Sequence, residues 1–255
     1  MNQTTAPPWS TAWIVGGSTG IGRDITLKLA ALGVKVAVSS RSANKLAELA
    51  AAHENITAFP VDITDVQALV STYREISEQF GAIDLALLNA GVWHPMSVGE
   101  FDVERCRQSM EVNHGGITNT LQVLLPDMLA KDSGHIGLVA SVAGYRGLPK
   151  AIAYAPSKAA VISLAEVLKL ELEGTNVDIS LINPGFVETP MTSVNEFPMP
   201  YIISSDDAAE RIIKGLRRRR FEIAFPWQLV WSLKFLRILP YSWYFPLARR
   251  MTREG

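Results

Sequence analysis

Tyr154 and Lys158 place a phenol and an ammonium group four residues apart. On a helix this spacing puts both side chains on one face, one turn apart. A free tyrosine, with a pKa of about 10, exchanges protons poorly near neutral pH, and a neighbouring lysine favours the phenolate and lowers that pKa. The pair predicts a general acid or base. Taken alone it fits an amphipathic helix with a snorkelling lysine better, so the rest of the chain must decide.

A glycine-rich segment follows the first apolar run of the chain. Residues 12–15 are typical of a buried strand, and a helical pattern extends from this segment to Leu32. Glycines let the backbone turn tightly and approach a pyrophosphate held at the helix N-terminus. An ordinary turn is the alternative, but the position directly after the first strand favours a nucleotide site. The expected phosphate-binding residues are Gly16, Ser18, Thr19, Gly20, Ile21 and Gly22.

The end of the second expected strand, residues 34–39, indicates which cofactor binds. In NAD-binding units an acid near this point holds the ribose 2′-hydroxyl. Here Ser40 and Arg41 follow the strand and no acid is present. A guanidinium group pairs well with a phosphate, so these residues favour NADP over NAD. A solvated loop arginine is the alternative.

Strands and helices alternate along the rest of the chain. We expect the main helices at 65–80 (with Thr64 as N-cap), 103–110, 116–129 and 154–170, and further strands at 56–61, 83–88, 135–140, 177–182 and 221–225. This alternation predicts an α/β fold, a single doubly wound domain with a central parallel sheet flanked by helices on both faces. Right-handed crossovers bring the carboxyl ends of the strands to one edge, where ligands bind in open α/β sheets.

These motifs resemble the short-chain dehydrogenase/reductase family, from about Trp13 to Thr192. The glycine motif and Asn89-Ala90-Gly91 match family motifs in order. Val15 and Leu88 replace a threonine and an asparagine of the family pattern, which puts some rigidity of the glycine loop in question. The resemblance implies that the remaining cofactor contacts are Asp62, Ile63, Asn89, Ala90, Gly91, Pro184, Gly185, Val187 and Thr189, together with Tyr154 and Lys158.

The resemblance also implies a catalytic tetrad of Asn113, Ser141, Tyr154 and Lys158. Tyr154 is expected to give a proton to a carbonyl oxygen during hydride transfer, while Ser141 hydrogen-bonds the same oxygen. Lys158 lowers the tyrosine pKa and binds the nicotinamide ribose, and Asn113 holds a water that links Lys158 to solvent. No metal is required. A homodimer or homotetramer, packed through the helices that carry Asn113 and Tyr154, is expected from the same resemblance.

Composition sets the outer limits of the prediction. The 255 residues carry a net charge of −1 and one cysteine, Cys106, which suits a reducing compartment. Residues 1–10 lack the pattern of a signal peptide and are expected to form a flexible N-terminus. We assign residues 11–225 to the Rossmann-type domain and 226–255 to a C-terminal helical extension. The expected location is cytoplasmic, with a peripheral position at the inner face of a membrane as a further option.

The C-terminal part of the chain is basic and aromatic. Residues 211–255 hold eleven Lys or Arg and two Glu, so their formal net charge is +9, whereas that of the rest of the chain is −10. Projected on a helix, residues 227–239 are apolar on most sides, and no run is long enough to span a bilayer. Two interpretations remain open: peripheral contact with a membrane, or a cover over the substrate pocket or a subunit interface. Either one suggests a lipophilic substrate.

The sequence thus predicts an NADP-dependent oxidoreductase that interconverts an alcohol and a carbonyl compound. A 3-oxoacyl thioester reductase is the alternative within enzymes. A non-catalytic NADP-binding sensor or scaffold is the alternative of another class, although such a protein is expected to lose the Tyr154 and Lys158 pair. Nucleic-acid binding rests only on the run Arg217–Arg220 and is not expected.

Overall fold

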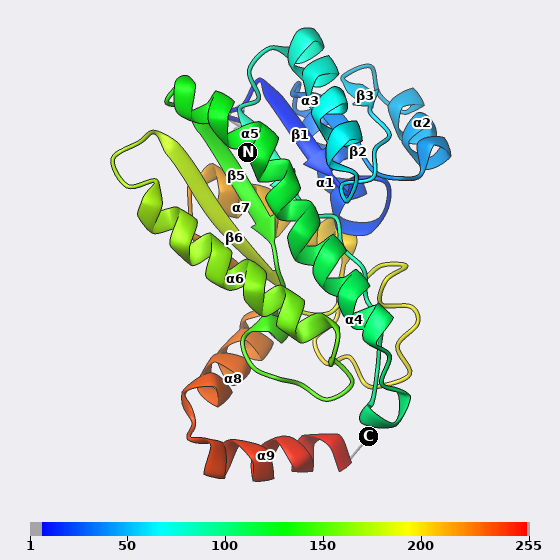
Figure 1. Cartoon of the computed structure of the whole chain (residues 1–255), viewed down its shortest axis with the longest axis vertical. Helices are drawn as coiled ribbons and strands as arrows, with labels where there is room; N and C mark the ends of the chain where they lie inside the picture. Colours follow the sequence, from blue (N-terminus) through cyan, green and yellow to red (C-terminus); the bar gives the residue numbers. More distant parts are fainter. Residues whose placement is uncertain (1–6, 254–255) are drawn as a thin grey trace, which may run out of the picture.

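The computed structural model describes residues 7–253 and centres on a seven-stranded sheet (Figure 1). The strand order is β3-β2-β1-β4-β5-β6-β9, and every neighbouring pair is parallel. This arrangement confirms the predicted doubly wound α/β fold. The strands are β1 (Thr11–Val15), β2 (Lys35–Ser39), β3 (Ile56–Ala58), β4 (Leu85–Leu88), β5 (Gly134–Val139), β6 (Val177–Pro184) and β9 (Glu222–Phe225).

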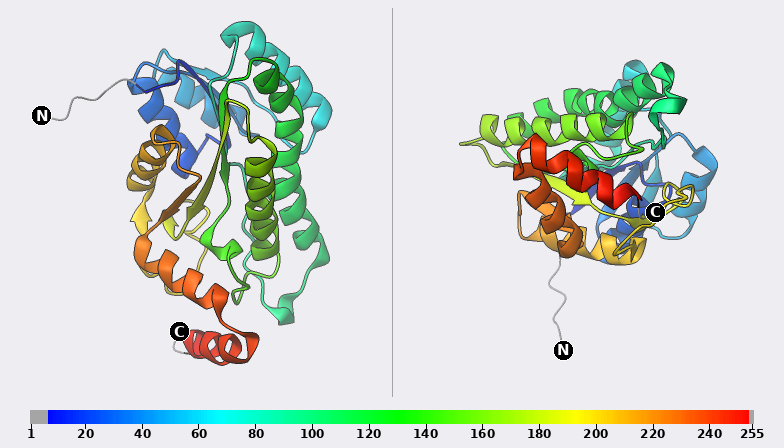
Figure 2. Two further views of the ribbon diagram at one scale, coloured as in Figure 1. Left: turned by 90° about the vertical axis from the view of Figure 1, so that its left-hand side faces the viewer. Right: turned by 90° about the horizontal axis from the view of Figure 1, so that it is seen from below.

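Helices cover both faces of the sheet (Figure 2). One face packs against α3 (Val66–Phe80), α5 (Gly116–Ala130) and α6 (Tyr154–Glu171). The opposite face packs against α1 (Gly20–Ala31), α2 (Ala43–Ala51) and α7 (Ser205–Arg217). The result is three layers with a hydrophobic core on each side of the sheet.

Strand β1 shows how one strand supplies both cores. Trp13 and Val15 join the core beneath α3 and α5, whereas Ile14 joins the core beneath α1 and α7. Side chains alternate between faces along a strand, so a strand buried on both sides needs apolar residues at successive positions. All five residues of β1 are buried, which explains why it appears in the sequence as a short continuous apolar run.

The start of α3 differs by one residue from the prediction. Asp65, rather than Thr64, is the N-cap, and its carboxylate accepts a hydrogen bond of 3.0 Å from the Ala68 amide. Thr64 instead bonds to Asp62, because both its amide and its hydroxyl donate to the Asp62 carboxylate, at 3.0 and 2.8 Å. A carboxylate at this position also suits the positive end of the helix dipole.

The segment before α5 is a second feature that sequence periodicity does not reveal. Helix α4 (Val103–Met110) continues through a π-helical turn, Glu111–Gly115, directly into α5. A π-turn inserts one residue into the helical repeat and is often found at functional positions. Here it contains Asn113, one of the predicted catalytic residues.

The C-terminal helices lie beyond the carboxyl edge of the sheet. Two short strands, β7 (Val187–Glu188) and β8 (Ile203–Ser204), pair with each other and bracket a loop, and 3₁₀ turns occur at Val98–Glu100 and Val142–Gly144. After β9 the chain forms α8 (Trp227–Ile238) and α9 (Tyr241–Arg253), which lie at the bottom of Figure 1. None of the helices in the described part of the chain is long and apolar enough to cross a membrane.

The predicted flexible N-terminus is described only in part. Residues 1–6 lie outside the described residues. Trp9 is buried against His135, with ring centroids 6.0 Å apart, and the Ser10 amide donates to the Asp84 carboxylate at 2.7 Å. Burial of a large indole offsets the entropy lost when the chain is ordered, so contact with the fold already begins at this tryptophan.

Candidate active site

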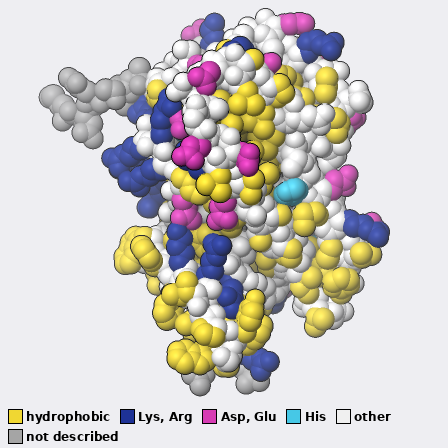
Figure 3. All heavy atoms as spheres, turned by 60° about the vertical axis from the view of Figure 1, so that its left-hand side comes forward, with side chains coloured by type: hydrophobic (Ala, Val, Ile, Leu, Met, Phe, Trp, Pro, Cys, Tyr) yellow, Lys and Arg dark blue, Asp and Glu magenta, His cyan; other side chains and the backbone are white. Residues whose placement is uncertain are grey.

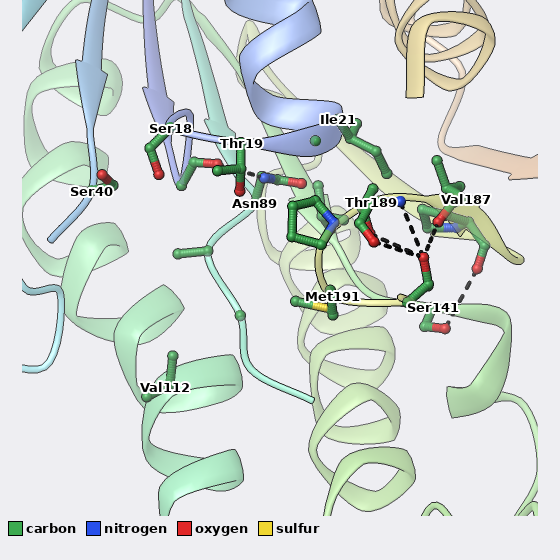
Figure 4. Close-up of a pocket in the computed structure, with 18 of the residues that line it drawn as sticks. Ser18, Thr19, Ile21, Ser40, Asn89, Val112, Ser141, Val187, Thr189 and Met191 are labelled. Atoms are coloured by element: carbon green, nitrogen blue, oxygen red, sulfur yellow. Dashed lines mark hydrogen bonds between the residues drawn. The ribbon is translucent and has the colours of Figure 1, made fainter. Parts of the chain in front are cut away.

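A cavity of about 390 Å³ follows the carboxyl edge of the sheet. Every cofactor residue predicted from the sequence lines it except Gly22: Gly16, Ser18, Thr19, Gly20, Ile21, Ser40, Arg41, Asp62, Ile63, Asn89, Ala90, Gly91, Tyr154, Lys158, Pro184, Gly185, Val187 and Thr189. Figure 4 shows Ser18, Thr19 and Ser40 toward one end and Ser141, Thr189 and Met191 toward the other. Residues that the sequence did not indicate, such as Val112 and Thr192, complete the wall.

The glycine loop is closely packed and needs its glycines. Gly16 has a φ of +84°, and a Cβ there would lie 2.5 Å from the Ala90 amide nitrogen. A Cβ on Gly22 would lie 2.3 Å from the Gly16 carbonyl oxygen. Gly22 therefore packs against the backbone of the loop and does not line the cavity. Contacts this short exclude any side chain. These positions therefore fix the shape of the cradle.

Hydrogen bonds hold this loop although Val15 and Leu88 supply none from their side chains. The Gly16 amide donates to the Ser39 carbonyl at 2.7 Å, and the Asn89 side-chain amide donates to the Gly16 carbonyl at 2.8 Å. Val15 and Leu88 are instead buried in the core. The strands on both sides of β1 thus anchor the loop, and the two departures from the family pattern do not leave it untethered.

The first turn of α1 fits a phosphate group. Thr19 is the N-cap, and within the described structure its side chain makes no capping hydrogen bond. The first amide groups of a helix have no partner inside the helix, and together with the helix dipole they favour an anion. The glycine cradle and these amides suit the pyrophosphate of a dinucleotide.

The two residues from which the sequence predicts NADP lie at the far end of the cavity. Ser40 and the exposed Arg41 both line it, directly after β2. Among the described residues that line the cavity, Asp62 is the one acid, and its carboxylate already accepts from Thr64. Arg23, another nearby cation in the sequence, pairs with Asp24 at 3.4 Å and is not among the lining residues. Arg41 is therefore the better placed cation for a 2′-phosphate.

Tyr154, Lys158 and Ser141 meet at the opposite end of the same cavity. Tyr154 begins α6, and Lys158 lies one turn later, as the spacing predicts. The Lys158 ammonium is buried, donates to the Val139 carbonyl at 2.9 Å and lies 5.6 Å from the centroid of the Tyr154 ring. Ser141 follows β5, and its hydroxyl accepts from the Ala143 amide at 3.1 Å.

The pKa values in this structure differ from the sequence-based expectation. Burial raises the pKa of Tyr154 to about 12, an effect that the Ser141 hydroxyl partly opposes. Burial lowers the pKa of Lys158 to about 8. Removal of water disfavours the charged form of each group, and Lys158 directs its ammonium to a carbonyl rather than to the phenol. The lowering of the tyrosine pKa by Lys158 is therefore not seen here.

Asn113 joins two segments of the site. Its side chain accepts from the Val92 amide at 2.7 Å and donates to the Val92 carbonyl at 3.0 Å and to the Ser157 hydroxyl at 2.9 Å. A Cβ on Gly91 would lie 3.1 Å from the Asn113 amide oxygen and 3.5 Å from the Lys158 nitrogen. The π-helical turn thus brings Asn113 close to Lys158 and ties the end of β4 to α6.

A second cavity, of about 500 Å³, adjoins the first and shares Ser141, Tyr154, Gly185, Met191 and Thr192 with it. Its wall is largely apolar, and side chains of α8 and α9 contribute to it. The apolar and aromatic residues that line it include Trp93, Val142, Leu148, Pro149, Phe186, Phe197, Pro198, Pro200, Leu229, Leu233, Leu236 and Tyr244. The inner sides of the C-terminal helices therefore form part of this wall.

Trp93, which closely follows Asn89-Ala90-Gly91, lines the apolar cavity, whereas Met96 does not. The Trp93 ring stands edge-on to Tyr154, with centroids 4.9 Å apart, and its indole donates to the Asn195 side chain at 2.8 Å. Met96 is buried, and its sulfur accepts from the Asp102 amide at 3.1 Å. Met96 therefore has a packing role.

Among the side chains that the structure describes, no group of three His, Cys, Asp or Glu is arranged to hold a metal ion. His135 lies in the core, where its ring is 2.8 Å from the Ser180 hydroxyl. Tyr154 and Ser141 bring to the cavity a phenol that can transfer a proton and a hydroxyl that can hydrogen-bond a reacting oxygen.

Comparison with known proteins points to the same chemistry. A family model described as short chain dehydrogenase matches residues 10–197. An uncharacterised oxidoreductase of Myxococcus xanthus is 36% identical over 247 residues, which cover 95% of this chain and 98% of that protein. An uncharacterised oxidoreductase of Staphylococcus saprophyticus is 34% identical over 212 residues, covering 81% and 91%.

Solved structures share the fold. A short chain dehydrogenase/reductase from Burkholderia phymatum, in complex with NAD, superposes with a TM-score of 0.83 at 25% identity and covers 91% of this chain and 94% of its own. A short-chain dehydrogenase from Streptomyces avermitilis gives a TM-score of 0.81 at 21% identity. The match covers 96% of this chain and 98% of that one. The second likeness concerns the fold alone.

Proposed function

Because this chain belongs to the short chain dehydrogenase family of oxidoreductases, we propose that it transfers a hydride between NADP and a lipophilic alcohol or carbonyl compound. One observation carries the proposal: Ser141 and Tyr154 lie on the boundary between the dinucleotide cavity and the apolar cavity. A carbonyl group held there would have a cofactor on one side and two hydroxyl groups within reach.

The chain supplies the means to hold the cofactor. The glycine loop and the first amides of α1 would receive the pyrophosphate, and Arg41 would pair with the 2′-phosphate. Thr189 packs near Gly20, where an added Cβ would lie 2.8 Å from the threonine methyl group. Thr189 would contact the nicotinamide end of the cofactor. When bound, the cofactor supplies or accepts the hydride.

Tyr154 is the proton donor for reduction. Its raised pKa keeps the phenol protonated at neutral pH, which is the form that gives a proton to the oxygen as negative charge develops there. Ser141 donates a hydrogen bond to the same oxygen and stabilises that charge. A protonated phenol suits carbonyl reduction at neutral pH better than alcohol oxidation.

Lys158 and Asn113 support this proton transfer. The pKa of Lys158, lowered to about 8, places its ammonium near the range in which it can exchange protons at working pH. Its position beside Asn113 and Gly91 supports the role of a relay toward solvent. We propose that Lys158 binds the nicotinamide ribose and that Asn113 positions the water of this relay.

The substrate is lipophilic because the cavity that receives it is apolar. Five aromatic side chains and the leucines of α8 line a volume of about 500 Å³. Burial of a CH₂ group in such a site contributes about 0.8 kcal/mol, so affinity should rise with chain length until the cavity is filled.

The test is the oxidation of NADPH by the purified protein, followed with aldehydes and ketones of increasing chain length. We expect kcat/KM to rise with apolar length and then to level off. Thioesters of 3-oxo acids, tested in parallel, identify the thioester reductase if they exceed the simple ketones of equal length. Binding of NADPH without turnover of any compound would contradict the enzyme proposal and indicate the sensor or scaffold instead.

The enzyme is further proposed to work as a homodimer or homotetramer packed through α4, α5 and α6. Exposed apolar side chains on these helices support the proposal, among them Val103, Met110, Val167 and Leu170.

A further inference from the structure

Helix α8 has two apolar sides with different surroundings. Its inner side, Val230, Leu233 and Leu236, is buried, and Leu233 and Leu236 line the apolar cavity. Its outer side carries exposed apolar residues at intervals of four, four and three positions, which places them in one row along the helix. These residues are Trp227, Trp231, Phe235 and Ile238, with exposed fractions of 67%, 68%, 57% and 77%.

Helix α9 continues this apolar surface and is held firmly in place. Tyr244 is buried, whereas Tyr241, Trp243 and Phe245 are exposed. The Arg146 guanidinium lies 4.6 Å from the Tyr241 ring centroid and 4.2 Å from that of Tyr244, and it donates to the Arg237 carbonyl at 2.8 Å. These contacts attach α9 to the loop that precedes α6, so the exposed rings lie on a helix that packs on the rest of the fold. We call the outer row of α8 together with Tyr241, Trp243 and Phe245 the tail face.

Basic residues prevail in the segment that forms the tail face, although one of them, Lys234, pairs with Glu222 of β9. Residues 227–253 contain five Lys or Arg and no Asp or Glu. Figure 3 shows Lys and Arg side chains among the hydrophobic side chains at this end of the molecule. The run Arg217–Arg220 does not belong to it, because it precedes β9 at the amino edge of the sheet, where Arg219 pairs with Asp178 at the start of β6. The basic C-terminal part of the sequence is thus divided between two ends of the molecule.

We propose that the tail face binds the surface of an anionic lipid bilayer. Tryptophan and tyrosine favour the boundary between headgroups and acyl chains, and neighbouring Lys and Arg are attracted to anionic lipids. Helix α8, with twelve residues, is suited to lie in the plane of this boundary. The proposal concerns a surface and does not depend on the reaction proposed above.

A second copy of the chain fits this surface less well. A two-fold interface would place the tail face against itself and bring the cations of the two copies together. Glu222, which already pairs with Lys234, is the one acid among residues 221–253 that could balance them. An anionic bilayer supplies the balancing charge. Because the inner sides of the same helices line the apolar cavity, such binding would bring the wall of the substrate pocket to the membrane.

The test uses the full-length protein and sedimentation with vesicles of phosphatidylcholine containing about 30% phosphatidylserine. We expect binding at low salt, weaker binding to pure phosphatidylcholine, and release at about 0.5 M NaCl, where the Debye length is only a few ångströms. Tryptophan emission should shift to the blue on binding, since three exposed tryptophans, Trp227, Trp231 and Trp243, lie on the tail face.

Two matched pairs of variants locate the surface. Trp231→Gln combined with Phe235→Gln should reduce the vesicle partition coefficient about tenfold or more, whereas Leu129→Gln, an exposed apolar residue at the far end of α5, should not. Arg237→Glu should reduce it about tenfold, whereas Arg218→Glu, the same change at the opposite edge, should leave it unchanged.

Three results would overturn the proposal. The first is that the protein does not sediment with anionic vesicles at low salt. The second is that a tail variant and its control lose vesicle binding equally. The third is that the Trp231 and Phe235 double variant changes the oligomeric state in the absence of lipid. The last result would assign the tail face to a second copy of the chain.

Discussion

At the residue scale, Tyr154 and Lys158 show what spacing can and cannot predict. The four-residue interval places both on the first turn of α6, beside the cavity. It does not predict their protonation, because burial raises the pKa of Tyr154 and lowers that of Lys158. Burial is a tertiary property, set by strands and loops far away in the sequence.

Tyr154→Phe should separate the proton donor from the binding site. The change removes the hydroxyl and keeps the ring that packs against Trp93, so the protein should still bind NADPH. We expect kcat for carbonyl reduction to fall by about 10²–10⁴-fold, the usual loss for a general acid. Fluorescence titration with NADPH is the control, and near-normal turnover would remove Tyr154 from this role.

The raised pKa of Tyr154 also predicts a pH dependence. Oxidation of an alcohol needs the deprotonated phenol, which is scarce below a pKa of about 12. The rate of oxidation should therefore rise steadily from pH 7 to pH 9 and beyond, while the rate of reduction at neutral pH should change little. Initial rates in both directions between pH 6 and pH 10 measure this difference. An oxidation rate that does not change over this range would contradict the assignment of Tyr154 as the base.

We expect Arg41 and Ser40 to determine the choice of cofactor. A charge-assisted hydrogen bond from Arg41 to a 2′-phosphate contributes about 1.5–3 kcal/mol, so the wild type should prefer NADPH over NADH by about tenfold or more in kcat/KM. Ser40→Asp combined with Arg41→Ala should reverse or abolish this preference, since a carboxylate repels the phosphate and accepts from ribose hydroxyls. Arg23→Ala is the matched control, because Arg23 pairs with Asp24 and does not line the cavity. Equal use of NADH and NADPH by the wild type would show that Arg41 is only a solvated loop residue.

At the element scale, strongly periodic segments could be predicted and local exceptions could not. Helix α6 and the central strands follow from apolar patterns and begin or end within about two residues of their predicted bounds. The π-helical turn at Asn113 has no signal of this kind. The two-sided character of α8 is also absent from its pattern, because apolar residues that face a cavity look the same as those that face outward.

Strand β5 carries a buried histidine that links stability to pH. Burial lowers the pKa of His135 to about 4, an effect that Arg219 and Lys169 strengthen and Asp178 opposes. In the unfolded chain this pKa is about 6.5, so between these values only the unfolded chain binds the proton. The free energy of unfolding should therefore fall as the pH is lowered from about 6.5 to 4, by at most about 3 kcal/mol.

This linkage can be measured by thermal unfolding at pH 7 and pH 5. Each kcal/mol corresponds to about 2–4 °C in a chain of this size. His135→Gln cannot take up the proton and keeps a polar group near Ser180, so its Tm should depend less on pH than that of the wild type. Equal pH dependence of the two proteins would show that other groups govern the acid response.

At the scale of the whole molecule, the topology of the sheet makes the site predictable. Six motifs that are distant in sequence lie at one edge of the sheet because the parallel strands end there. They are the glycine loop, Arg41, Asp62, Asn89, Ser141 and Pro184-Gly185. The apolar cavity could not be predicted in the same way, since its wall combines loops with α8 and α9. The separation of Arg217–Arg220 from the tail face likewise depends on the direction of β9 and not on the distance along the sequence.

The oligomeric state tests the arrangement of the surfaces. Val167 and Leu170 lie three positions apart on the solvent side of α6, with exposed fractions of 50% and 70%. We expect light scattering to give the mass of a dimer or tetramer. A two-fold interface repeats every contact, so Val167→Glu combined with Leu170→Glu would place four carboxylates in one interface and should shift the protein toward monomer.

The control for this assembly is the Trp231→Gln and Phe235→Gln double variant, which changes the other exposed apolar surface. If α4, α5 and α6 form the interface, this variant should have the oligomeric mass of the wild type, whereas the α6 variant should have a lower mass. Both α6 positions are exposed in the single chain, so the monomer should remain folded, with unchanged far-UV circular dichroism. A wild type that is already monomeric would contradict assembly through this face. An α6 variant of unchanged mass would also contradict it, because a stable interface cannot retain buried carboxylates that have no partner.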